Sequence, residues 1–223
     1  MIRALIFDFD GLIIDTESPD YQSWQEVYRE YGAELPLQLW ADVIGSGPAA
    51  SFEPYSYLEE RVGRALDREV IRGRHKRREA ELIAGERVLP GVETYIAEAQ
   101  RLGLKLGVAS SSPLDWVEGH LTRLGLVDHF EAIRSADDVP RTKPDPALYV
   151  TALDALGVRA EEAIALEDSP HGVTAANRAG IYCVAVPNAL TGRLSLDHAD
   201  RVLSSLADLP LEALLSEVSE DGR

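Results

Sequence analysis

Two carboxylates lie side by side in Asp8-Phe9-Asp10-Gly11, directly after the apolar run of residues 2–7. An apolar run of this length that ends in acidic residues and a glycine is typical of a strand buried on both faces. At the end of such a strand, one carboxylate could attack an electrophile while its neighbour transfers protons. The alternative is an ordinary turn with solvated aspartates, as Asp-Gly often forms.

A second acidic pair, Glu167 and Asp168, follows the apolar run of residues 163–166. Four carboxylates at one sheet edge would repel each other unless a cation joined them. The sequence has no His-Glu-x-x-His motif and a single cysteine, so the available ligands are hard oxygens and Mg²⁺ is the expected metal. Taken alone, Asp168 could instead cap a helix that starts near Ser169-Pro170.

Ser110 and Ser111 follow the apolar run of residues 104–109, and Lys143 precedes a predicted helix. Hydroxyl and backbone N–H groups at the end of a strand form a cradle for an anion. Ser112-Pro113 fits a helix cap, which leaves Ser110 to be explained. Only three of the 22 basic residues are lysines, so a lysine at position 143 indicates a need for its compact charge.

The elements that position these residues alternate between strand and helix. Apolar runs at residues 2–7, 104–109, 130–133, 163–166 and 182–186 predict five strands, and helical periodicity separates the last four. This alternation predicts an α/β fold with a doubly wound, Rossmann-like parallel sheet. In such sheets, ligands bind beyond the carboxyl ends of the strands.

Residues 17–84 interrupt the alternation with helical patterns at 21–31, 35–44, 55–62 and 67–83 and with no convincing strand. We expect a small all-helical domain here, inserted into a core formed by residues 1–16 and 85–223. Within it, Asp20 could bind substrate hydroxyls or cap the following helix. Lys76 could bind substrate or lie on a solvated helix face.

Composition narrows the classes of function. With 45% hydrophobic and 27% charged residues, the chain of 223 residues has the balance of a globular protein. Its net charge of −16 disfavours nucleic acid, and its N-terminal apolar run is too short for a signal peptide or a membrane span. We expect a cytoplasmic monomer that acts on a small molecule.

The four motifs, in this order at successive strand ends, resemble those of the haloacid dehalogenase-like hydrolase superfamily. They are Asp8-Phe9-Asp10-Gly11, Ala109-Ser110-Ser111, Lys143-Pro144 and Leu166-Glu167-Asp168-Ser169. The match covers essentially the whole chain. The helical insertion is similar to the smaller cap type of that superfamily, and the segment from Asp8 to Glu17 is most similar to its β-phosphoglucomutase-like group.

The resemblance implies a phosphatase with an aspartyl-phosphate intermediate on Asp8. Asp10 would protonate the leaving oxygen and later deprotonate water. Asp8, the backbone carbonyl of Asp10, and Asp168 would bind Mg²⁺, with Glu167 acting directly or through water. Ser110 and Lys143 would hold the phosphoryl oxygens, and the substrate would be a small phosphorylated metabolite such as a sugar or polyol phosphate.

Two departures separate the sequence from the sugar phosphomutases of that group. Asp20 stands where they have a cap histidine, and residues 45–51 contain no counterpart of their cap arginine. Hydrolysis is therefore favoured over phosphoryl isomerisation, with the phosphomutase as the alternative. A more remote alternative is a receiver-like module that only accepts phosphate, but such modules have no inserted cap and no proton-handling aspartate two residues after the first.

Overall fold

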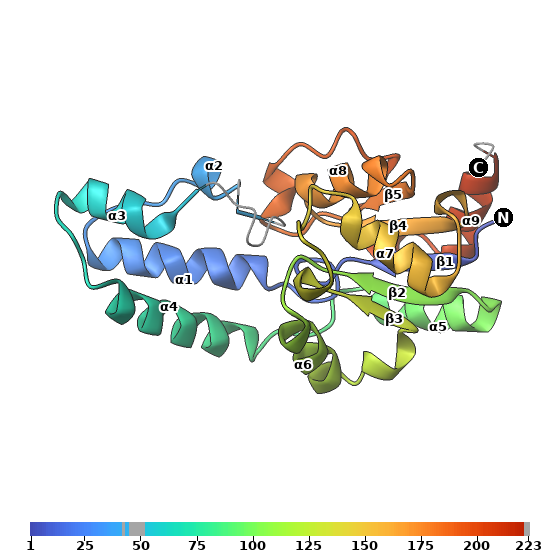
Figure 1. The fold of residues 1–223 in the computed structure, drawn as a ribbon, viewed down its shortest axis with the longest axis horizontal. Coiled ribbons are helices and arrows are strands. Elements are labelled where there is room, and N and C mark those ends of the chain that lie inside the picture. Colours follow the sequence, from blue (N-terminus) through green and yellow to red (C-terminus); the bar gives the residue numbers. More distant parts are fainter. Residues whose placement is uncertain (42, 45–51, 221–223) are drawn as a thin grey trace.

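The computed structural model describes residues 1–41, 43–44 and 52–220. Its centre is a six-stranded parallel sheet with the order β3-β2-β1-β4-β5-β6 (Figure 1). The strands are β1 (Ala4–Phe7), β2 (Lys105–Ala109), β3 (Ala132–Arg134), β4 (Ala163–Glu167), β5 (Tyr182–Ala185) and β6 (Arg201–Val202). The predicted parallel sheet is confirmed.

Helices cover both faces of the sheet because successive side chains of a strand point to opposite faces. Leu5 and Phe7 of β1 pack in one hydrophobic cluster, and Ala4 and Ile6 pack in another. The core helices are α5 (Val92–Leu102), α6 (Leu114–Leu124), α7 (Ala147–Leu156), α8 (Pro170–Arg178) and α9 (Leu211–Glu220). Residues of α5, α6 and α9 join the first cluster, and residues of α7 and α8 join the second.

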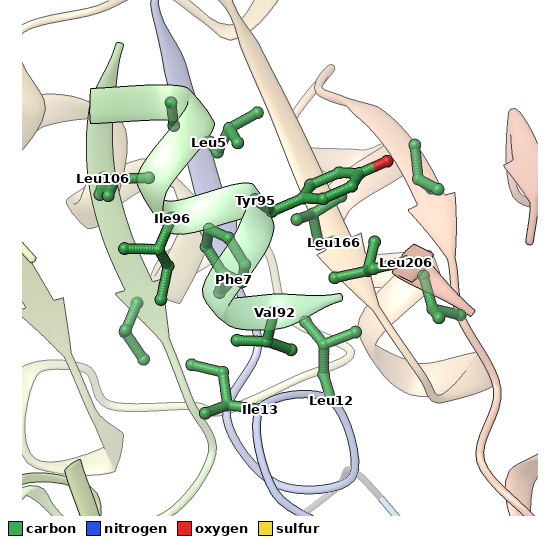
Figure 2. Close-up of a cluster of buried hydrophobic side chains, with 14 of the residues drawn as sticks. Leu5, Phe7, Leu12, Ile13, Val92, Tyr95, Ile96, Leu106, Leu166 and Leu206 are labelled. Atoms are coloured by element: carbon green, nitrogen blue, oxygen red, sulfur yellow. The ribbon is translucent and has the colours of Figure 1, made fainter. Parts of the chain in front are cut away.

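The first cluster shows how the alternating pattern becomes packing. Val92, Tyr95 and Ile96 project from one side of α5 onto Leu5 and Phe7 of the sheet (Figure 2). Their spacing of three and four residues places them on a single helix face. Gly103, with φ of 71°, ends α5 in the left-handed conformation that favours glycine.

Four helices lie between β1 and α5 in the chain: α1 (Glu17–Glu30), α2 (Leu37–Trp40), α3 (Pro54–Val62) and α4 (Arg68–Ile83). They lie at one end of the molecule, on the left in Figure 1, while the N-terminus lies at the other end. They share a third hydrophobic cluster that includes Trp24, Tyr28 and Trp40. Leu190, which follows β5, also belongs to this cluster.

The helix predicted for residues 35–44 is only one turn long as α2, with Pro36 preceding its first residue. The sequence also gave no sign of β6, because its two residues are exposed and carry no apolar pattern. Single turns of 3₁₀ helix connect the larger elements; they are Val127–His129, Ala136–Asp138, Ala160–Glu162, Thr191–Arg193 and Leu206–Asp208. None of the described helices has both the length and the apolar character to cross a lipid bilayer.

Candidate active site

The register of the sheet brings three of the predicted motifs to one edge. Phe7 of β1 pairs with Val108 of β2 and with Leu166 of β4. The strand ends are therefore level, and the residues that follow them emerge side by side. Asp8 follows β1, Ser110 follows β2, and Glu167 is the last residue of β4.

A tight turn after β1 allows Asp8 and Asp10 to reach the same edge. The N–H of Ile13 donates to the carbonyl of Phe9, and the N–H of Gly11 donates to the carbonyl of Ile14. Gly11 has φ of 83°, and a Cβ atom there would collide with the carboxylate of Asp168. Glycine is therefore required both by the backbone conformation and by the close approach of the second acidic motif.

Lys143 is the centre of a buried charge cluster. Its Nζ donates to Asp8 Oδ1 at 2.7 Å and to Glu167 Oε1 at 2.6 Å. Burial opposes the charge of this lysine, but the two carboxylates outweigh that effect and raise its pKa. The Tyr149 hydroxyl also donates to Glu167 Oε1, at 2.5 Å. Asp8, Lys143 and Glu167, which belong to three separate motifs of the sequence, thus form a single network.

Burial dominates the acidity of Asp8. It raises the pKa of Asp8 to about 8, with a further contribution from Glu167, against the opposing effect of Lys143. The pKa of Asp168 is also raised, first by burial and then by Asp8 and Glu167. The alternative of a solvated Asp-Gly turn is wrong, because Asp8 is only 3% exposed.

The carboxylates of Asp8, Glu167 and Asp168 fit a divalent cation. One oxygen of each lies within 4.8 Å of the others. Asp168 Oδ2 accepts a hydrogen bond from Asn188 Nδ2 at 2.9 Å, whereas the buried Oδ1 has no hydrogen-bond partner among the described residues. A cation would satisfy this oxygen and offset the mutual repulsion. The helix-cap alternative for Asp168 is wrong, since Ser169 caps α8.

Asp10 accepts hydrogen bonds from four side chains. Thr16 Oγ1 and Trp116 Nε1 donate to its Oδ1 at 2.7 and 2.9 Å. Ser112 Oγ and Ser110 Oγ donate to its Oδ2 at 2.6 and 3.2 Å. The hydroxyl of Ser110 is therefore beside Asp10. The helix cap expected at Ser112 is wrong, because α6 begins after Pro113 with no side-chain cap.

A cavity of about 430 Å³ opens over Asp8 and Asp10. Ser111 and Ser112 line it from the core, and Asp20, Lys76 and Glu79 line it from α1 and α4. Lys143 and Ser110 are fully buried and are not among the described lining residues. The structure thus brings Asp20 and Lys76 to the same cavity as the catalytic aspartates predicted from the sequence.

The cavity side of the insertion has its own polar contacts. His75 Nε2 lies 2.7 Å from Asp20 Oδ1, and Lys76 Nζ donates to Glu79 Oε2 at 2.8 Å. Burial, followed by the neighbouring Asp20, raises the pKa of Glu79. Asp20 does not cap a helix, because α1 begins at Glu17. Lys76 is largely exposed, as expected for a solvated helix face, and it also lines the cavity, so substrate binding by Lys76 stays a prediction.

Sequence reasoning missed four polar groups at this edge: Thr16, Trp116, Tyr149 and Glu79. Trp116, Tyr149 and Glu79 lie in none of the motifs identified in the sequence. Thr16 lies in the segment from Asp8 to Glu17, but the resemblance assigned it no role. Tyr149 falls within the apolar stripe of its helix, where an aromatic residue indicates core packing. Asn188 had only a weak signal in the sequence, which is its position shortly after the fifth apolar run.

Comparison with known proteins places this geometry in a family. A profile described as haloacid dehalogenase-like hydrolase matches residues 5–186. The chain belongs to the haloacid dehalogenase-like hydrolases. The match contains all four motifs and the helical insertion, as the resemblance implied.

Individual relatives of this hydrolase cover nearly its whole length. YhcW of Bacillus subtilis (strain 168), which carries the name of a phosphatase, is 48% identical over 98% of this chain and 99% of its own. Hexitol phosphatase B of Escherichia coli (strain K12) is 33% identical over 96% of this chain and 97% of its own. The crystal structure of β-phosphoglucomutase from Clostridium difficile superposes with a TM-score of 0.78 at 25% identity, covering 99% of each chain.

Proposed function

We propose that this hydrolase is a Mg²⁺-dependent phosphatase that releases phosphate from a small sugar or polyol phosphate. The observation that carries the proposal is the position of Asp8. Its carboxylate lines a cavity beside Asp10, and the buried Lys143 holds one of its oxygens. The names of two relatives, a phosphatase and a hexitol phosphatase, support the same activity.

Asp8 is the proposed nucleophile. An oxygen of its carboxylate forms a bond to phosphorus while the bond from phosphorus to the ester oxygen breaks, which leaves an aspartyl-phosphate and an alkoxide. Asp10 donates a proton to that alkoxide, and the alcohol departs. Asp10 then takes a proton from water, whose oxygen attacks the phosphorus and restores the Asp8 carboxylate.

The remaining polar groups position the phosphoryl group. Lys143 supplies a fixed positive charge, and the hydroxyl of Ser110 and the backbone of Ser111 lie at the adjoining strand end. Asp8, the backbone carbonyl of Asp10, and Asp168 would hold the metal, with Glu167 directly or through water. When bound, Mg²⁺ neutralises charge on the phosphoryl oxygens and on these carboxylates.

We take residues 17–84 to be a cap that closes over the substrate, with residues 1–16 and 85–223 as the core. The reason is that α1 and α4 present side chains to the same cavity as the core aspartates. Closure of such a cap would exclude water and complete the pocket. The segment 45–51, where the phosphomutase arginine has no counterpart in sequence, lies outside the described residues.

The test measures inorganic phosphate released from a panel of phosphomonoesters, in excess Mg²⁺ and after chelation by EDTA. We expect turnover that depends on Mg²⁺ and that falls to background in Asp8→Asn, which keeps the size of the side chain but removes the nucleophile. Equal rates for wild type and Asp8→Asn would refute the role of Asp8. Accumulation of a sugar bisphosphate without phosphate release would indicate a phosphomutase instead, and phosphorylation without repeated alcohol release would indicate a receiver-like module.

A further inference from the structure

The charged residues that line the cavity are mostly acidic. Apart from Asp8 and Asp10, the charged residues that line it within the described part of the chain are Glu17, Asp20, Lys76, Glu79 and Asp115. Among the described residues, Lys76 is thus the sole basic residue that lines the cavity, against four carboxylates besides Asp8 and Asp10. Residues 42 and 45–51 cannot change this balance towards the positive, because their sequence contains no lysine or arginine.

Lys76 is already paired with another residue that lines the cavity. Lys76 Nζ donates to Glu79 Oε2 at 2.8 Å, and Glu79 is only 6% exposed. A second anionic group on a substrate would therefore have to compete with a buried carboxylate for this lysine. It would also face Asp20 and Glu17 at close range. The repulsion between two like charges is much stronger in a partly desolvated pocket than in water.

Asp20 and Glu79 are spaced to bind a single donor group. One oxygen of each lies within 4.8 Å of the other, together with a ring nitrogen of His75. The N–H bonds of an ammonium group diverge by about 109°, so two acceptors about 2.8 Å from its nitrogen lie about 4.6 Å apart. The two carboxylates could thus both accept hydrogen bonds from one ammonium group of a bound substrate.

The position of Asp20 is fixed by buried aromatic residues. Its Oδ1 lies 2.7 Å from Nε2 of His75, whose side chain is 4% exposed. The imidazole packs against the indole of Trp24, with the ring centres 4.4 Å apart. Asp20 therefore presents its carboxylate to the cavity with little rotational freedom, which favours selection by a defined polar contact.

We propose that Asp20 and Glu79 determine specificity, selecting a monophosphorylated polyol that carries a basic amine. Such a compound is preferred over its neutral counterpart and over one that carries a second anion. The inference rests on the proposed phosphatase function, since the phosphate must lie at Asp8 for the rest of the substrate to reach α1 and α4. It concerns only the part of the substrate that leaves as the alcohol.

The experiment compares four esters: glucosamine 6-phosphate, glucose 6-phosphate, 6-phosphogluconate and glucose 1,6-bisphosphate. Phosphate release in excess Mg²⁺ gives kcat/KM for each, with p-nitrophenyl phosphate as a probe of the phosphoryl site alone. A charge-assisted hydrogen bond to the amine predicts a kcat/KM about 10- to 100-fold higher for the amino sugar than for glucose 6-phosphate. The two substrates with a second anion should react at least about tenfold more slowly than glucose 6-phosphate.

Variants test which residues cause the selection. In Asp20→Asn and Glu79→Gln, the ratio of kcat/KM for the amino sugar to that for glucose 6-phosphate should fall towards one. In Lys76→Met the ratio should rise, because Glu79 loses its internal partner. Asp154→Asn is the matched control, since this exposed carboxylate lies near the end of α7, and it should leave the ratio unchanged. The ratio does not depend on how much of a variant folds.

The outcomes separate the two proposals. An amino sugar that reacts no faster than glucose 6-phosphate, or a second anion that is tolerated, overturns the selection by charge and leaves the phosphatase intact. Hydrolysis of p-nitrophenyl phosphate but of none of the four sugars also overturns it. An unchanged ratio in both Asp20→Asn and Glu79→Gln removes these residues from the selection. Failure to hydrolyse any ester, p-nitrophenyl phosphate included, refutes the proposed function, and the inference falls with it.

Discussion

At the scale of single residues, the contacts of Asp10 suit its proposed role as a carboxyl group that donates and accepts a proton. Its four hydrogen-bond donors stabilise the carboxylate, and they come from three different parts of the chain: Thr16 from the linker, Ser110 and Ser112 from the loop after β2, and Trp116 from α6. Such a carboxylate is rigidly placed beside Asp8. The four contacts hold it in the same position for both proton transfers of the proposed reaction.

Replacing Asp10 with Asn should therefore slow hydrolysis most for the esters whose alcohol is the poorest leaving group. An alkyl alkoxide needs a proton as it departs, whereas p-nitrophenolate does not. We expect kcat/KM to fall about 10²- to 10⁴-fold for an alkyl phosphate and much less for p-nitrophenyl phosphate in the first half-reaction. Rapid-quench measurement of alcohol release checks this. Equal losses for the two esters would contradict the role of Asp10 as the acid.

A site residue could be predicted only where the residues next to it in the sequence indicate its role. Asp8, Lys143 and Asp168 could be predicted, because each directly follows an apolar strand or stands out in an arginine-rich chain. Tyr149 and Trp116 could not, because an aromatic residue on a helix serves the core equally well. Their polar atoms reach the site only through the packing of α7 and α6 on the sheet, which is a tertiary property.

At the scale of elements, the start of α8 is shaped by the acidic motif before it. Gly172 lies within the first turn of α8, where alanine would ordinarily favour the helix. A Cβ atom at this position would overlap all of the terminal atoms of the Glu167 carboxylate. The glycine thus allows the helix to pack against a buried carboxylate that also binds Lys143 and Tyr149.

Gly172→Ala should consequently displace Glu167 and weaken both Mg²⁺ binding and turnover. We expect a loss of unfolding free energy of about 1–3 kcal/mol from overpacking, measured by chemical denaturation. Gly119→Ala is the matched control, because Gly119 lies inside α6 with nothing within 4 Å of the added methyl group. That variant should gain about 0.5–1 kcal/mol. A stabilised Gly172→Ala with unaltered Mg²⁺ binding would show that Glu167 has no fixed place.

The elements themselves were predictable wherever burial and periodicity agree. The strands β1, β2, β4 and β5 are buried along nearly their whole length, so their uninterrupted apolar runs are enough to predict them. β6 has two exposed residues and exists because it pairs with β5, which no local pattern reveals. The helix predicted for residues 35–44 is shorter than its apolar spacing indicated, because α2 ends at Trp40. Trp40 and Ile44 are nevertheless both buried in the hydrophobic cluster of the inserted helices.

At the scale of the whole molecule, the buried acidic cluster should govern how stability responds to pH. The pKa of Asp8 is about 8 in the folded chain, against 3.8 as its ordinary value. Between these two values the unfolded chain loses the proton and the folded chain keeps it. Stability of the metal-free protein therefore declines as pH rises from about 4 to about 8. The raised pKa of Asp168 acts in the same direction.

A divalent cation should reverse this trend, because it binds the deprotonated carboxylates. Below about pH 8, binding must displace a proton from the cluster, so affinity should weaken by up to about tenfold per pH unit. We expect the rise in Tm caused by excess Mg²⁺, relative to EDTA, to be larger at about pH 8 than at about pH 6. In Asp8→Asn this dependence should weaken, because only Asp168 would still have to lose a proton, whereas the exposed Asp154→Asn should keep it. A gain in Tm that is the same at both pH values would mean that the cation binds without displacing these protons, and the cluster of Asp8, Glu167 and Asp168 would then not be its site.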